Sequence, residues 1–140
     1  MLSLILKAAE NFCIHQIRSA HDTKECTPKK RTLIAYLDIE AHGGEKYRTY
    51  IGCDEILLQC ITEIFLGEEI SDMETLRDML LETTNMIVGS AKVLAAESSL
   101  HPFTISTPHY FTDDASTTVF DACKTLSVSG GEMLIAFKEL

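Results

Sequence analysis

Residues 78–92 read Asp-Met-Leu-Leu-Glu-Thr-Thr-Asn-Met-Ile-Val-Gly-Ser-Ala-Lys and form the centre of a long segment with apolar residues every three or four positions. This spacing predicts an amphipathic α-helix over about residues 72–96, with Ser71 or Asp72 as its N-cap. At 100° per residue, one face of this helix carries an apolar line. Its members are Leu76, Leu80, Thr84, Ile87, Ala91 and Leu94. We expect this line to lie on a β-sheet.

The segments around this helix predict the rest of the fold. Helical spacing recurs in residues 2–18 and in Asp54–Phe65, which Gly67 follows. Strand patterns occur in two hairpins, each with a Gly pair at its turn, and in one further strand. These strands are Leu33–Ile39 with Tyr47–Ile51, Ala122–Ser129 with Glu132–Glu139, and Phe103–Thr107. The order predicts an α+β (layered α/β) fold in which long helices pack on an antiparallel sheet, as a single domain over residues 1–140.

Two polar stretches are predicted to be loops. Cys26–Arg31 contains Pro28 and three basic residues, and Thr112–Thr118 contains two adjacent aspartates. The basic stretch has the charge to contact an acidic partner, but we favour a solvated loop as the explanation of its composition.

Composition excludes several classes of function. The chain has 46% hydrophobic and 24% charged residues and a net charge of −9, which repels nucleic acid and anionic membrane surfaces. We expect no membrane span, because no apolar stretch approaches the roughly 18 residues that a span needs. We expect no signal peptide either, because residues 1–9 contain one basic residue, Lys7, and no small-residue cleavage site follows a long apolar run. The five cysteines are odd in number, scattered and without a Cys-x-x-Cys pair, which favours a reducing cytoplasm. The histidines lack the spacing of zinc ligands, so no metal site is expected.

The helix face opposite the apolar line is polar. Within about 80° of one another it carries Asp78, Glu82, Asn85, Gly89 and Lys92, which we call the polar stripe. A solvated helix face explains the charged residues. It does not explain Asn85 and Gly89, because in a helix interior Asn costs about 0.5 kcal/mol and Gly about 1 kcal/mol relative to Ala. An amide that can donate to and accept from a water molecule suggests a function for the stripe.

The pattern Asp78-x3-Glu82-x2-Asn85-x22-Pro108 resembles the signature of the CheC, CheX and FliY chemotaxis phosphatases. The flanking stretches 81–92 and 65–69 also resemble that family's active-site helix and the segment before it. CheC-like members carry two such sites and CheX-like members one. Because Asn11 and Asn85 are the only asparagines in the chain, the resemblance is to a CheX-like member with a single site.

This resemblance implies a phosphatase that hydrolyses the aspartyl phosphate of a CheY-type response regulator. Glu82 would dock the helix on a lysine of the receiver, and Asn85 would orient the attacking water. Asp78, Gly89 and Pro108 would support the site. The Mg²⁺ of the reaction would belong to the phosphorylated receiver, so we expect no cofactor or metal in this chain.

The sequence leads to two further expectations, one about an alternative function and one about oligomeric state. The same helix face would also suit a non-catalytic binding module for a receiver or a flagellar-switch protein, and Asn85 is the feature that distinguishes catalysis from docking. CheX-like relatives are dimers, and the C-terminal hairpin would offer an exposed strand edge with Met133, Ile135 and Phe137 on one face. We therefore expect a homodimer.

Overall fold

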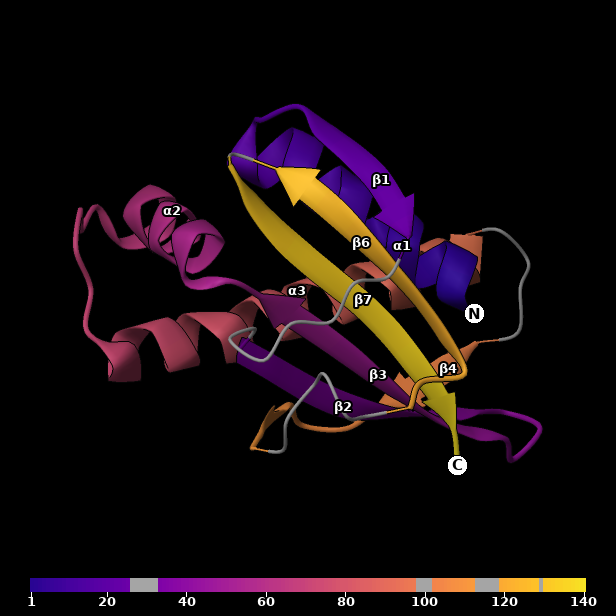
Figure 1. Ribbon diagram of the computed structural model, residues 1–140. Coiled ribbons are helices and arrows are strands. Elements are labelled where there is room, and N and C mark those ends of the chain that lie inside the picture. The colour runs from indigo at the N-terminus through magenta and orange to yellow at the C-terminus, as the bar shows by residue number, and fades with distance from the viewer. Residues whose placement is uncertain (26–32, 98–101, 113–118, 129) are drawn as a thin grey trace.

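An antiparallel sheet of seven strands carries the helices on one of its faces (Figure 1). The computed structural model describes residues 1–25, 33–97, 102–112, 119–128 and 130–140. The helical elements are α1 (Leu2–Phe12), which continues into the π-helix η1 (Cys13–Ile17), α2 (Glu55–Leu66) and α3 (Met73–Glu97). The strands are β1 (His21–Glu25), β2 (Leu33–Ala41), β3 (Lys46–Cys53), β4 (Phe103–Ile105), β5 (His109–Phe111), β6 (Ala122–Val128) and β7 (Gly131–Glu139).

The strand order is β1-β6-β7-β3-β2-β4, with β5 also paired to β2. Both predicted hairpins are confirmed: Leu33 lies opposite Cys53 in the first, and Val128 lies opposite Gly131 in the second. Their turns contain Gly44 at φ 91° and Gly130 at φ 77°, a backbone region that side chains with a Cβ rarely adopt. The predicted α+β class with an antiparallel sheet is therefore confirmed.

The three predicted helical segments are confirmed, although the one predicted over residues 2–18 changes from α-helix to π-helix after Phe12. The Asp54 carboxylate accepts a hydrogen bond from the Leu57 amide at 2.9 Å and caps α2, which ends at Gly67 in the left-handed conformation. Asp72 accepts a hydrogen bond from the Thr75 amide at 2.8 Å at the start of α3. Hydrogen bonds from the backbone amide and the side chain of Thr75 hold the pKa of Asp72 below its usual range. Of the two candidate caps for α3, Asp72 is thus the one used.

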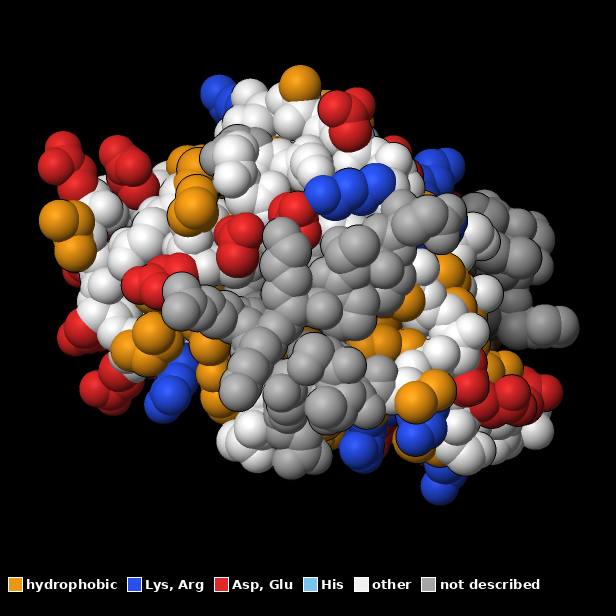
Figure 2. All heavy atoms as spheres, in the orientation of Figure 1, with side chains coloured by type: hydrophobic (Ala, Val, Ile, Leu, Met, Phe, Trp, Pro, Cys, Tyr) orange, Lys and Arg blue, Asp and Glu red, His pale blue; other side chains and the backbone are white. Residues whose placement is uncertain are grey.

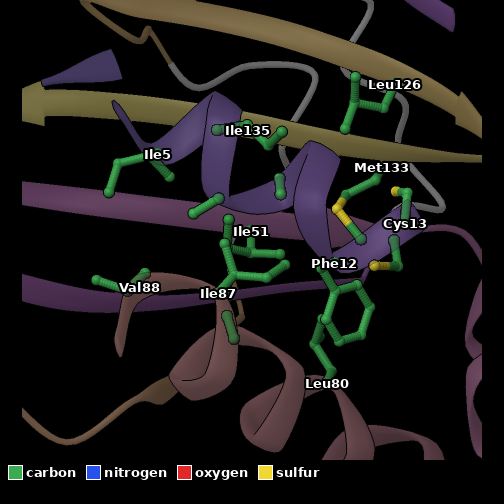
Figure 3. Packing of buried hydrophobic residues seen from close by; sticks show 14 of the residues in the cluster. Ile5, Phe12, Cys13, Ile51, Leu80, Ile87, Val88, Leu126, Met133 and Ile135 are labelled. Carbon is green, nitrogen blue, oxygen red and sulfur yellow. The ribbon is translucent and has the colours of Figure 1, made fainter. Parts of the chain in front are cut away.

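A continuous core lies between the helices and the sheet (Figure 3). Ile87 of α3 and Ile51 of β3 lie beside each other there, and Phe12 of α1 approaches Leu80 of α3. Leu80, Ile87 and Ile51 are fully buried. The apolar line predicted for residues 72–96 faces this core, with Leu94 half-buried at its end.

The C-terminal hairpin differs from its prediction. β7 lies in the middle of the sheet between β6 and β3, so it has no open edge. Met133 and Ile135 are fully buried beneath the helices. The expectation that this hairpin exposes an edge for dimerisation is wrong, because both edges of β7 are already hydrogen-bonded to neighbouring strands.

The sequence patterns did not predict the short strands β1 and β5, and they predicted β4 to be longer than it is. β1 is the polar sequence His-Asp-Thr-Lys-Glu, without apolar alternation, and it forms a strand through pairing with β6. β5 pairs with Ile34–Tyr36 of β2, whereas β4 pairs with Ile39–Ala41 on the same edge. The strand predicted over Phe103–Thr107 ends at Ile105.

The predicted loop at Cys26–Arg31 lies outside the described residues, as do residues 113–118 of the predicted Thr112–Thr118 loop. Among the described residues, no helix combines the length and apolar character that crossing a membrane requires.

Candidate functional site

The polar stripe lies on the outer face of α3. Asp78, Glu82, Asn85 and Lys92 are exposed, and Gly89 is half-buried. Glu82 and Asn85 are three residues apart, so they are neighbours on one turn of the helix. The predicted outward orientation of this face is confirmed.

The buried side of α3 determines how the stripe is oriented. Leu80, Thr84 and Ile87 are fully buried, so rotation of the helix would expose apolar surface to water. The Thr84 hydroxyl donates to the Leu80 carbonyl at 2.8 Å and needs no further partner. Glu82 and Asn85 are therefore presented from a rigid element.

The side chains of the stripe are available to a partner molecule. Within the described part of the chain, neither Asp78, Glu82 nor Asn85 makes a side-chain hydrogen bond or an ion pair. A Cβ built on Gly89 would meet no atom within 4 Å, so packing inside the protein does not require glycine there. The stripe thus offers a carboxylate and an amide without competition from internal contacts.

A groove of about 430 Å³ runs beside the stripe, between the end of α2 and the first half of α3. Asp78 and Glu82 line its α3 side, whereas Asn85 is not part of its lining. Most of the remaining lining is apolar and comes from Phe65, Leu66, Met79 and Met86. The sequence patterns did not predict this groove; its one signal in the sequence is the apolar pair Phe65-Leu66 directly before the helix-ending Gly67.

Pro108 lies in the segment that joins β4 to β5 and is half-buried. β5 packs beside α3, where the guanidinium carbon of Arg77 lies 4.9 Å from the centroid of the Tyr110 ring. Arg77 and the groove residue Met79 are on opposite flanks of α3. The segment with Pro108 therefore borders α3 on the flank away from the groove.

Two buried cysteines of the described residues, Cys13 and Cys53, are poor nucleophiles. Burial raises the pKa of Cys13 to about 11 and raises that of Cys53 further, so both are neutral thiols at physiological pH. Cys13, Cys53 and Cys60 are free, whereas Cys123 is disulfide-bonded. The disulfide removes the support that the cysteine pattern lent to a reducing compartment.

The sequence of this chain matches a known protein family. The family described as chemotaxis phosphatase CheX matches residues 38–128, well over half of the chain. The chain belongs to the CheX family. The match includes the polar stripe of α3 and Pro108, and it excludes α1 and β7.

Solved structures show that the CheX fold extends over the whole chain. A CheX chemotaxis protein from Vibrio vulnificus has a TM-score of 0.81 at 21% identity, covering 99% of this chain and 95% of its own. A chemotactic CheC-like protein from Shewanella oneidensis has a TM-score of 0.77 at 19% identity, with 99% and 96% coverage. CheX from Borrelia burgdorferi, solved in complex with CheY, BeF3 and Mg²⁺, has a TM-score of 0.71 at 16% identity, with 99% and 97% coverage. No curated protein matches the sequence.

Proposed function

We propose that this CheX-family protein is a protein aspartyl-phosphate phosphatase that acts on a CheY-type response regulator through the polar stripe of α3. The observation that carries the proposal is the arrangement of Glu82 and Asn85, which are exposed on one helical turn without internal partners. The Borrelia CheX that was solved with CheY, BeF3 and Mg²⁺ supports a receiver as the partner.

Asn85 is the proposed catalytic residue. Its amide oxygen accepts a hydrogen bond from a water molecule and its amide nitrogen donates one, which aligns the water with the phosphorus atom. The water oxygen bonds to phosphorus as the bond from phosphorus to the aspartyl oxygen breaks. Inorganic phosphate leaves, and the receiver regains a free carboxylate. Alignment of this kind is worth roughly 10²-fold or more in rate.

Glu82 is the proposed docking residue. Its carboxylate would pair with the receiver's active-site lysine and thereby set the position of Asn85 over the phosphoryl group. Asp78 adds negative charge one turn earlier on the same stripe. Gly89 leaves room for the receiver to approach the helix backbone, which explains a glycine that internal packing does not need. Pro108 would shape the segment that borders the other flank of α3.

This chemistry needs no metal or cofactor on this chain. Mg²⁺ would be bound by the receiver, where it offsets the charge of the phosphoryl group. The protein would meet its substrate in the cytoplasm.

The direct test is phosphate release from a phosphorylated CheY-type receiver, measured with and without this protein at several protein concentrations. The expected result is a decay rate that rises with protein concentration and saturates. Decay that stays at the receiver's own rate despite measurable binding would replace the phosphatase by the non-catalytic binding module.

We also propose a homodimer on the basis of the family resemblance, although the C-terminal hairpin does not supply an open strand edge for it. Among the described residues, the sheet ends at β1, a type of edge through which strands pair between chains. Light scattering over a wide concentration range tests this. A particle of 15.6 kDa throughout would exclude the dimer.

A further inference from the structure

The groove between α2 and α3 has no role in the proposed chemistry, yet it shares Glu82 and Asp78 with the polar stripe. A specific protein interface covers roughly 800 Å² on each partner, which is far more than two side chains. Because Glu82 lines this groove, a receiver that pairs with Glu82 lies against the rim of the groove.

The walls of the groove are suited to an apolar side chain. Phe65 stacks on Phe12 of α1, with ring centroids 6.2 Å apart and 15° between the ring planes, and it also lines the groove. Leu66 is 54% exposed at the groove, and Met79 and Met86 form its base on α3. Burial of this exposed apolar surface by a partner would be favourable, and such surface often marks an interaction site.

The charge of the residues around the groove indicates which kind of partner would bind there. Residues 55–82 contain eight acidic residues and one basic residue, Arg77, and the eight acidic residues are all exposed. Arg77 lies over the Tyr110 ring on the other flank of α3. Figure 2 shows acidic side chains gathered with apolar ones at the end of the molecule formed by α2 and the start of α3. A second copy of this chain, with its net charge of −9, would be repelled there.

We propose that the groove binds an apolar side chain of the receiver that has lysine or arginine residues beside it. This inference rests on the proposed function for the identity of the partner, and it adds a contact that selects among receivers. Pairing at Glu82 positions the reacting groups, whereas the groove supplies affinity through burial of apolar surface. Added salt should weaken the complex, because the rim of the groove is acidic.

The test compares Leu66→Ser with Ile56→Ser, a matched control at a position of α2 that is 62% exposed and does not line the groove. Binding is measured to a purified CheY-type receiver carrying beryllofluoride and Mg²⁺, and phosphate release is measured on the phosphorylated receiver. We expect Leu66→Ser to weaken binding roughly tenfold without changing the rate at saturating receiver. Ile56→Ser and the volume-conserving Leu66→Met should bind as the parent does, and all variants should melt together.

The outcomes separate the two proposals. If Leu66→Ser binds with the parent's affinity, the groove proposal is overturned even where phosphate release continues. If the parent binds without accelerating decay and Leu66→Ser still weakens binding, the phosphatase proposal fails and the groove proposal holds. If Leu66→Ser reduces self-association instead of receiver binding, the occupant is a second copy and the groove proposal is overturned. A parent that does not bind the receiver at all overturns both.

Discussion

The Asp54 carboxylate joins the start of α2 to the start of β7, because one oxygen accepts a hydrogen bond from the Glu132 amide at 2.9 Å and the other caps α2 at Leu57. The carbonyl of Glu132 also accepts a hydrogen bond from the Asp54 amide at 3.2 Å. This double connection sets where α2 leaves the sheet. The Phe12–Phe65 stack fixes the other end of α2. The helix that forms one wall of the groove is therefore held at both of its ends.

Asp54→Ala removes the helix cap and the link to β7 together. We expect it to lower the free energy of unfolding by about 2–3 kcal/mol, because the two amides lose their acceptor. Urea unfolding of Asp54→Ala and Asp72→Ala measures the difference. Asp72 makes a cap contact with Thr75 only, so its loss should be smaller. Equal losses would show that the link to β7 contributes nothing.

Gly131 begins β7 beside this connection. A Cβ at this position would lie 2.6 Å from Oδ1 of Asp54 and 2.9 Å from the Leu57 backbone nitrogen. Gly131→Ala is therefore expected to destabilise the protein by about 1–3 kcal/mol. Gly89→Ala is the control: it meets no atom within 4 Å and should raise stability by about 0.5–1 kcal/mol through helix propensity. The melting temperatures of both variants measure these effects. A Gly131→Ala protein that melts at the parent's temperature would contradict the predicted clash.

Ile87 tests the orientation of α3. It is fully buried, so Ile87→Asp places a charge in the core and should cost several kcal/mol in unfolding free energy. Val93→Asp is the matched control on the same helix, because Val93 is 56% exposed. Denaturant titration followed by circular dichroism compares them. If both variants unfold with the parent's midpoint, the helix is rotated from the orientation described above.

Alkaline pH should destabilise the protein through Cys13. Burial raises the pKa of its thiol from 9.0 to about 11, so the unfolded chain loses this proton first as the pH rises. The contribution to stability is complete below pH 9 and is lost as the pH rises towards 11, by at most about 1.4 kcal/mol per pH unit. Urea unfolding at pH 8 to 10.5 should show a shallower decline for Cys13→Ala than for the parent. Identical slopes would assign the decline to other groups.

Glu82 and Asn85 should separate binding from catalysis. Glu82→Ala removes the docking carboxylate, so it should weaken binding to the phosphorylated receiver as well as lower turnover. Asn85→Ala removes only the alignment of water and should lower the rate at saturation with little change in binding. Because the acyl phosphate hydrolyses spontaneously, the rate should fall to the receiver's own decay and no further. An Asn85→Ala protein with full activity would refute the catalytic assignment.

Much of this protein could be predicted from local patterns. The apolar line through Leu80 and Ile87 predicted both the length of α3 and its exposed face, because helical periodicity is a local property of the chain. Asp54 and Gly67 marked the ends of α2 through hydrogen-bonding and backbone preferences that act over a few residues. The polar stripe with Glu82 and Asn85 follows from the same periodicity.

Only the tertiary structure decided which strands are neighbours. Alternation in β7 indicated an apolar face with Met133 and Ile135, but its place at the centre of the sheet depends on pairing with β3, more than seventy residues earlier in the sequence. β1 forms because β6 supplies its hydrogen bonds, although its own residues favour no strand. The groove likewise depends on Phe12 and Phe65, which are far apart in the sequence and meet only when α1 and α2 pack on the same sheet. Contacts between distant segments depend on the packing of the whole chain, so they cannot be predicted from local sequence patterns.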